Sequence, residues 1–84
     1  GSSDSCTQVG VAYEMGRGVT ADPTQAFVFY KEACQARNAN ACAHIGTMFL
    51  AGRSLQQDPA KAKQYFKRAC ALGLQTACSQ VRED

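Results

Sequence analysis

Apolar residues recur along the chain at the spacing of one helical face. Between Cys42 and Phe49 they fall at i, i+3, i+4 and i+7, and Gly46 lies within this stripe. A second kind of stripe occurs twice, formed by Ala26, Phe29, Tyr30, Ala33 and Cys34, and by Ala62, Tyr65, Phe66, Ala69 and Cys70. This spacing is typical of amphipathic α-helices. Because a glycine inside a helix costs about 1 kcal/mol, we expect Gly46 to mark a close crossing of two helices.

Residues that begin and end helices bound these stripes. Asp22–Pro23 and Asp58–Pro59 place a capping side chain before a proline that suits the first helical position. Gly16 and Gly52 suit the C-terminal ends of the preceding helices. The pattern predicts an all-α fold without strands, with helices over residues 5–15, 23–36, 40–51, 59–72 and 75–82.

The whole pattern returns after 36 residues. Eleven of the 36 positions from 6 to 41 are identical to the positions 36 residues further on, among them the cysteines, the Asp-Pro pair and two glycines. A period of this length is typical of solenoid arrays. We predict one domain over residues 5–84, an α/α superhelix of about two helix-pair units (6–41 and 42–77) plus a C-terminal helix. Residues 1–4, which begin with "GSS", read as a cloning remnant and N-terminal tail.

Four of the five cysteines form two pairs with the same spacing. Cys34 and Cys42, and likewise Cys70 and Cys78, lie eight residues apart and symmetric about a predicted turn. Residues equidistant from the turn of a helical hairpin face each other, so each pair is placed to form a disulfide, which needs Cα atoms about 4.4–6.8 Å apart. An 84-residue chain buries a thin core, and each short-loop bridge adds about 2.5 kcal/mol. We therefore expect a disulfide-stapled fold in an oxidising compartment, periplasmic or secreted, with the signal peptide outside this sequence.

Cys6 is left over by this pairing. By the repeat, its partner would stand eight residues earlier, before residue 1. Three interpretations remain open, namely a buried structural thiol, a thiol separated from its partner, and a reactive or intermolecular thiol.

Charge and motifs exclude several classes of function. A net charge of +2 is too small to predict nucleic-acid binding, and no apolar run approaches the roughly 18 residues of a membrane span. We find no catalytic motif of the S-x-x-K or G-x-S-x-G type and no phosphate-binding loop. The C-x(2–4)-C spacing of zinc sites is also absent, so we predict no metal and no cofactor.

The candidate partner-binding surface is the face of the first helix of each unit that lies opposite the apolar stripe, where a concave groove would contact a peptide. In the second unit this face carries the only histidine, and the whole set is Gln8, Val11, Ala12, Met15, His44, Thr47 and Met48. The alternative for the same residues is packing between repeats or plain solvent exposure. Four basic residues on the second helix of the second unit, Lys61, Lys63, Lys67 and Arg68, read as a solvated face, with an anionic partner as the alternative.

The combined motif resembles a known repeat family. Starting at Cys6, the chain reads C-x(3)-G-x(2)-[YF]-x(2)-G-x(5)-D-x(3)-A-x(3)-[YF]-x(2)-A-C-x(7)-C. This is similar to the Sel-like repeat, a relative of the tetratricopeptide repeat, and the C-x(7)-C element resembles its cysteine-rich Hcp-type branch. Two positions depart from the family pattern, because Arg37 stands where glycine is frequent and "GRSL" (residues 52–55) replaces G-x-G-V.

The resemblance implies a scaffold for protein–protein contacts rather than an enzyme. Disulfides between neighbouring helices are also a property of the Hcp-type branch. Two alternatives follow from the same resemblance and from Cys6. One is an Hcp-type binder or weak hydrolase of β-lactams or cell-wall compounds, and the other is a redox or assembly factor. We expect another protein or peptide as the partner, with further Sel-like repeats upstream in the native chain.

Overall fold

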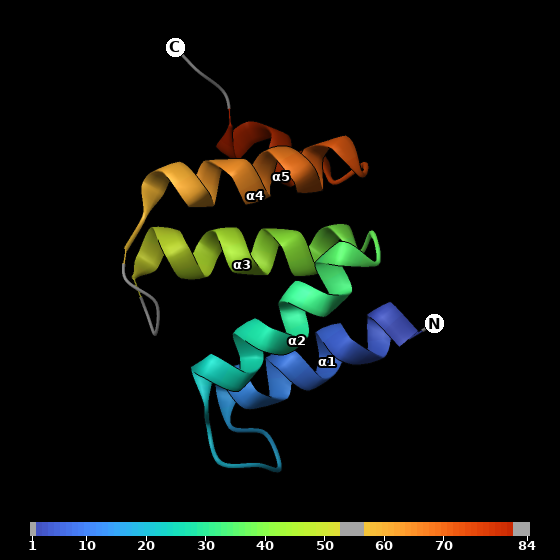
Figure 1. Cartoon of the computed structure of the whole chain (residues 1–84), viewed down its shortest axis with the longest axis vertical. Coiled ribbons are helices and arrows are strands. Elements are labelled where there is room, and N and C mark those ends of the chain that lie inside the picture. Colours follow the sequence, from blue (N-terminus) through green and yellow to red (C-terminus); the bar gives the residue numbers. More distant parts are fainter. Residues whose placement is uncertain (1, 53–56, 82–84) are drawn as a thin grey trace.

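The chain folds into a stack of two antiparallel helix pairs followed by a short fifth helix (Figure 1). A computed structural model describes residues 2–52 and 57–81, with side chains from residue 5 onward. Within that part it contains no strand and five helices, α1 (Ser2–Met15), α2 (Pro23–Gln35), α3 (Ala39–Ala51), α4 (Pro59–Ala71) and α5 (Gln75–Gln80). The predicted all-α solenoid is confirmed. The helix that we predicted from residue 5 begins at Ser2, and the helix predicted to reach residue 82, which lies outside the described residues, ends at Gln80.

Successive helices pack against their neighbours in order. α1 packs along α2, and α3 packs along α4, while the α2–α3 and α4–α5 contacts join one pair to the next. Figure 1 shows α3, α4 and α5 lying side by side, with the α1–α2 pair below them at an angle. The short α5 therefore covers α4 in the way that α3 covers α2.

Side chains before three helices satisfy their first backbone N–H groups. Asp22 accepts hydrogen bonds from the backbone N–H groups of the second and third residues of α2, at 3.2 and 3.3 Å. The side chain of Asp58 accepts a hydrogen bond of 3.1 Å from the backbone N–H of Lys61 at the start of α4. The buried Asn38, which we did not predict as a cap, accepts from Ala41 at 3.1 Å at the start of α3. Such a cap stabilises a helix by about 1 kcal/mol.

Two glycines allow the helices of each pair to approach closely. A Cβ atom built on Gly10 would lie 2.6 Å from Tyr30 Cε1, and one on Gly46 would lie 3.0 Å from three atoms of the Phe66 ring. Gly46 and Phe66 stand 36 residues after Gly10 and Tyr30. The close crossing expected at Gly46 is confirmed, and it occurs in both units.

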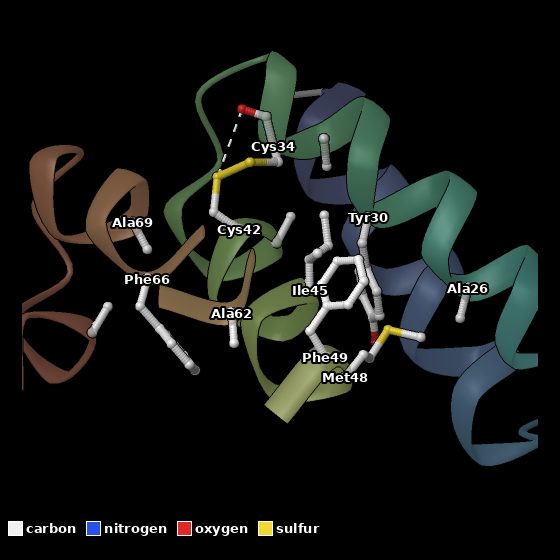
Figure 2. Packing of buried hydrophobic residues seen from close by; sticks show 13 residues of the cluster. Ala26, Tyr30, Cys34, Cys42, Ile45, Met48, Phe49, Ala62, Phe66 and Ala69 are labelled. Atoms are coloured by element: carbon white, nitrogen blue, oxygen red, sulfur yellow. Dashed lines mark hydrogen bonds between the residues drawn. A yellow bond between two sulfur atoms is a disulfide. The ribbon is translucent and has the colours of Figure 1, made fainter. Parts of the chain in front are cut away.

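The core is a thin layer built largely from small residues and cysteines. Its largest fully buried side chains are Tyr30, Ile45, Met48, Cys34 and Cys42. Figure 2 shows these side chains in one cluster between α2 and α3, with Phe66 and Ala62 of α4 on the other side of α3. Alanines at six core positions keep the helix axes close, but they contribute little buried apolar area.

Both disulfides cross the junctions between repeats. Cys34 of α2 is bonded to Cys42 of α3 with Cα atoms 4.8 Å apart, and Cys70 of α4 is bonded to Cys78 of α5 with Cα atoms 4.7 Å apart. The disulfide-stapled architecture is confirmed. Cys6 is half-buried and is not bonded to another described cysteine.

Candidate partner-binding groove

The predicted partner-binding face is divided by the packing of the two units. Met48 is 0% exposed, so its assignment to a binding surface is wrong. The reason is that α3 packs against the first helix pair, which covers this side of α3. His44 lies at the same junction, half-buried, with its ring stacked on Tyr30 at 4.8 Å between centroids. Met48 and His44 therefore pack between the two repeats, which was the alternative interpretation of these residues.

The other residues of the predicted face lie on two separate surfaces. Gln8, Val11 and Ala12 line a shallow hollow on α1, and Met15 near its end is 61% exposed. Thr47 instead lines a hollow between α3, α4 and α5. The seven residues therefore do not form one continuous surface.

Three titratable side chains meet where α1, α2 and α3 come together. The Tyr30 hydroxyl donates a hydrogen bond of 2.7 Å to Glu14 Oε1. Burial raises the pKa of Tyr30 far above its usual range, and the hydrogen bond and negative charge of Glu14 act in the same direction. Burial lowers the pKa of His44 below 6.5, against a smaller opposing effect of Glu14. Tyr30 and His44 are therefore favoured in their neutral forms, as suits packing groups at a junction.

A more developed hollow lies elsewhere, between α2 and α4. This groove has a volume of about 500 Å³ and is lined by Phe27 and Lys31 of α2, Phe49 of α3, and Lys61, Gln64, Tyr65 and Arg68 of α4. Cavities of about 300–1,000 Å³ are typical of ligand sites. Core residues of α2, α3 and α4 pack together, and the Cys34–Cys42 bridge also joins α2 to α3. The groove therefore belongs to the rigid part of the fold.

Aromatic rings form the floor of the groove. Phe49 is 8% exposed and is contacted from both sides. The Phe27 ring meets it edge-on at 5.9 Å, and the Tyr65 ring stacks on it, also at 5.9 Å between centroids. Because Phe49 is buried, the half-buried Phe27 and Tyr65 provide most of the aromatic surface that the groove exposes.

Basic side chains surround this floor. Lys61 Nζ lies 5.6 Å from the centroid of the Phe49 ring, a cation–π distance. Lys31 and Arg68 also line the groove, and none of the seven lining residues is acidic. From the sequence we expected Lys61 and Arg68 on a solvated face, with an anionic partner as the alternative, and we did not expect Phe27 or Lys31 at a site. The available signal was Phe27, a large apolar residue outside the core stripe of its helix.

The described residues form neither a metal site nor a membrane-spanning helix. No group of three or more His, Cys, Asp or Glu side chains in residues 5–52 and 57–81 is arranged to hold a metal ion. None of the helices in the described part is long and apolar enough to cross a membrane.

The fold defines the protein as a helical-repeat solenoid with disulfides at its repeat junctions. The family model for the Sel1 repeat matches residues 3–38 and 39–74, so the chain belongs to the Sel1 repeat family. Repeats of this family typically act as non-enzymatic scaffolds for protein interactions. The two matched units have the 36-residue period seen in the sequence.

Solved structures with the same fold come from several bacteria. Helicobacter pylori cysteine rich protein B (hcpB) is 30% identical over 92% of this chain and 58% of its own, with a TM-score of 0.87. A protective antigen of uropathogenic Escherichia coli strains displaying an SLR fold is 27% identical over 89% of this chain and 16% of its own, with a TM-score of 0.85. A Sel1 repeat protein from Oxalobacter formigenes, 23% identical over 94% of this chain and 32% of its own, shares the fold with a TM-score of 0.88.

The chain is thus shorter than these relatives and spans 58% or less of each of them. One of these relatives, hcpB, is a cysteine-rich protein. This similarity fits the cysteine-rich branch of the family that the C-x(7)-C spacing indicated. No curated protein matches the sequence.

Proposed function

We propose that this protein is an interaction scaffold of an oxidising, extracytoplasmic compartment that holds a segment of a partner protein in the groove between α2 and α4. The observation that carries the proposal is the groove itself, with three aromatic rings at its floor and a volume of about 500 Å³. Aromatic and arginine side chains in a sheltered pocket are the groups that contribute most binding energy at protein interfaces. The family's role as protein-interaction scaffolds supports the same function.

The geometry of the groove suits a peptide segment better than a flat protein surface. Its residues come from three helices, so a bound segment would contact both repeats at once. One occupant would then span the junction that the Cys34–Cys42 disulfide stabilises. Because the disulfide limits relative movement of α2 and α3, the groove needs little reorganisation when it binds.

The proposed compartment rests on the two disulfides. Bridges of this kind persist in secreted and periplasmic proteins and are rare in a reducing cytosol. Trapping thiols with an alkylating reagent in intact cells, followed by mass measurement, tests this part of the proposal. We expect Cys34, Cys42, Cys70 and Cys78 to be protected. Alkylation of all four in native cells would place the protein in a reducing compartment.

Selection of phage-displayed random peptides against the folded chain tests the function of the groove. Gln64 is exposed and lines the groove, so Gln64→Trp fills the space without disturbing the core. Lys67→Trp, on the same helix but outside the groove, is the matched control. We expect Gln64→Trp to lose the selected peptides and Lys67→Trp to keep them.

Two results would overturn the scaffold function. One is a set of selected peptides that binds both variants equally, because those peptides would then lie outside the groove. The other is hydrolysis of the β-lactam nitrocefin by the purified chain that a single substitution abolishes, since this would make the protein an enzyme.

A further inference from the structure

We propose that the groove between α2 and α4 selects acidic peptide segments, in which carboxylates flank an aromatic or other apolar side chain. This inference rests on the proposed function, because it assumes that the groove holds a peptide. It adds the chemistry of the occupant, which neither the family nor the related structures assign.

The first argument is charge complementarity. Three of the seven lining residues are cationic, and none is anionic. Lys31, Lys61 and Arg68 are all exposed, so each is accessible to an anion and its attraction is screened by salt. A neutral or basic segment would bring no negative charge to the cations that line the groove.

The second argument concerns where the cations stand. Lys61 and Arg68 are seven residues apart on α4, which is about 10.5 Å along a helix. Tyr65 lies between them, and Lys31 faces them from α2. The distance corresponds to about three residues of extended peptide. A segment with acidic residues three positions apart can therefore reach both ends of the groove while an apolar side chain between them contacts the rings.

The third argument comes from the internal repeat, which supplies a control surface. Tyr13 and Phe29 of the first unit stack at 5.7 Å, as Phe49 and Tyr65 do 36 residues later. The aromatic pair is therefore part of the repeat architecture.

The charges around that pair are not part of the architecture. The first-unit positions equivalent to Lys61 and Arg68 are occupied by Gln25 and Glu32, and all four residues are exposed. The same helical framework thus carries a neutral and an acidic side chain at these two positions in one unit and two basic side chains in the other. Because the fold does not require the basic residues, their place beside the rings points to a ligand.

The probes are three acetylated peptides that differ only in charge. They are Gly-Glu-Phe-Ala-Glu-Gly, the same peptide with both Glu replaced by Gln, and the same peptide with both Glu replaced by Lys. Each is titrated into the isotopically labelled chain, and binding is followed by the amide shifts of the groove residues. We expect the acidic peptide to bind about tenfold more tightly than the Gln peptide at low salt, which corresponds to two exposed ion pairs near the upper end of their usual strength. The preference should shrink as the salt concentration rises.

The variants use the residues of the first unit as replacements. Lys61→Gln combined with Arg68→Glu should abolish the preference for the acidic peptide while the Gln peptide binds as before. Lys67→Gln removes one exposed charge from the same helix outside the groove and should keep the preference. A melting curve for each variant confirms that it is folded.

The outcomes separate the two proposals. Equal binding of the acidic and Gln peptides in the groove would overturn acid selectivity and leave the proposed function standing. Absence of shifts in the groove with every peptide, including those selected by phage display, would overturn both. A loss of preference in Lys67→Gln as large as that in the double variant would also overturn acid selectivity, because the attraction would then come from overall charge.

Discussion

The ring of Tyr30 lies directly on the backbone of Gly10, closer than any side chain at position 10 would allow. Phe66 and Gly46 repeat this contact in the second unit. These two contacts explain why a glycine, which weakens an isolated helix, stands in the middle of α1 and of α3. The close approach of the two helices buries the aromatic ring, and this gain exceeds the loss of helix propensity.

Gly10→Ala tests this relationship. Alanine favours an isolated helix by about 1 kcal/mol over glycine, so an exposed site would be stabilised. Here the added methyl would meet Tyr30 Cε1 at 2.6 Å, and such overpacking costs about 1–3 kcal/mol. We expect a lower midpoint in urea unfolding. A smaller loss is expected for Gly46→Ala, where the nearest atoms lie at 3.0 Å, and an increase in stability for both variants would contradict the close crossing.

The two disulfides should contribute unequally to stability. Each closes a loop of the same length, worth about 2.5 kcal/mol in the chain-entropy model. Cys34 and Cys42 are also fully buried in the core, whereas Cys78 is half-buried. We expect Cys34→Ala with Cys42→Ala to lower the free energy of unfolding more than Cys70→Ala with Cys78→Ala, measured by urea titration. A reductant should lower the melting temperature of the wild type and leave a variant lacking both bridges unchanged. An unchanged wild type would contradict the structural role of the bridges.

Protonation of His44 should destabilise the fold. Burial lowers the pKa of His44 from about 6.5, so the unfolded chain binds this proton more readily than the folded chain. Its contribution to stability is therefore full above pH 6.5 and is lost as the pH falls through that value towards the lower pKa of the folded state. We expect the urea midpoint to decrease between pH 7 and pH 5, and His44→Phe, which keeps a ring on Tyr30, to decrease less over that interval. Equal pH dependence of the two proteins would show that other groups are responsible.

The backbone of Arg37, in the turn between α2 and α3, is strained in a way that a substitution can relieve. Arg37 has φ of 71°, in the left-handed region, where the equivalent residue of the second unit is Gly73 with φ of 108°. A non-glycine residue in this conformation costs about 1–2 kcal/mol. Because glycine also loses more entropy on folding, we expect Arg37→Gly to raise stability by up to about 1 kcal/mol and Arg37→Val to lower it. A higher urea midpoint for Arg37→Val than for Arg37→Gly would contradict this turn geometry.

The features that were predictable from the sequence are local and periodic. Helix starts at Asp22 and Asp58 follow from a few neighbouring residues, and the helix pairs follow from the 36-residue repeat. The cysteine pairs were predictable because the two cysteines of each pair are equidistant from a turn. In an antiparallel helical hairpin, residues at such positions face each other. Arg37 departs from the family pattern, yet its backbone keeps the turn.

The candidate site was harder to predict for a physical reason. Helical periodicity places residues on faces, but it does not say which face the next helix pair covers. Met48 and His44 were therefore assigned to a surface that the first unit buries. The groove joins Phe27, Phe49 and Lys61 from three helices, and their proximity depends on how the two pairs are oriented. No spacing along the chain encodes that orientation.

The position of the two crosslinks also decides how the protein would respond to mechanical tension. A pulling force along the backbone would pass from Cys34 to Cys42 and from Cys70 to Cys78 through sulfur, so residues 35–41 and 71–77 would carry no load. Extension would then draw out the helices themselves, and the two turns between repeats would keep their length. Tethered between two surfaces, the molecule would lengthen everywhere except at these two crosslinked turns.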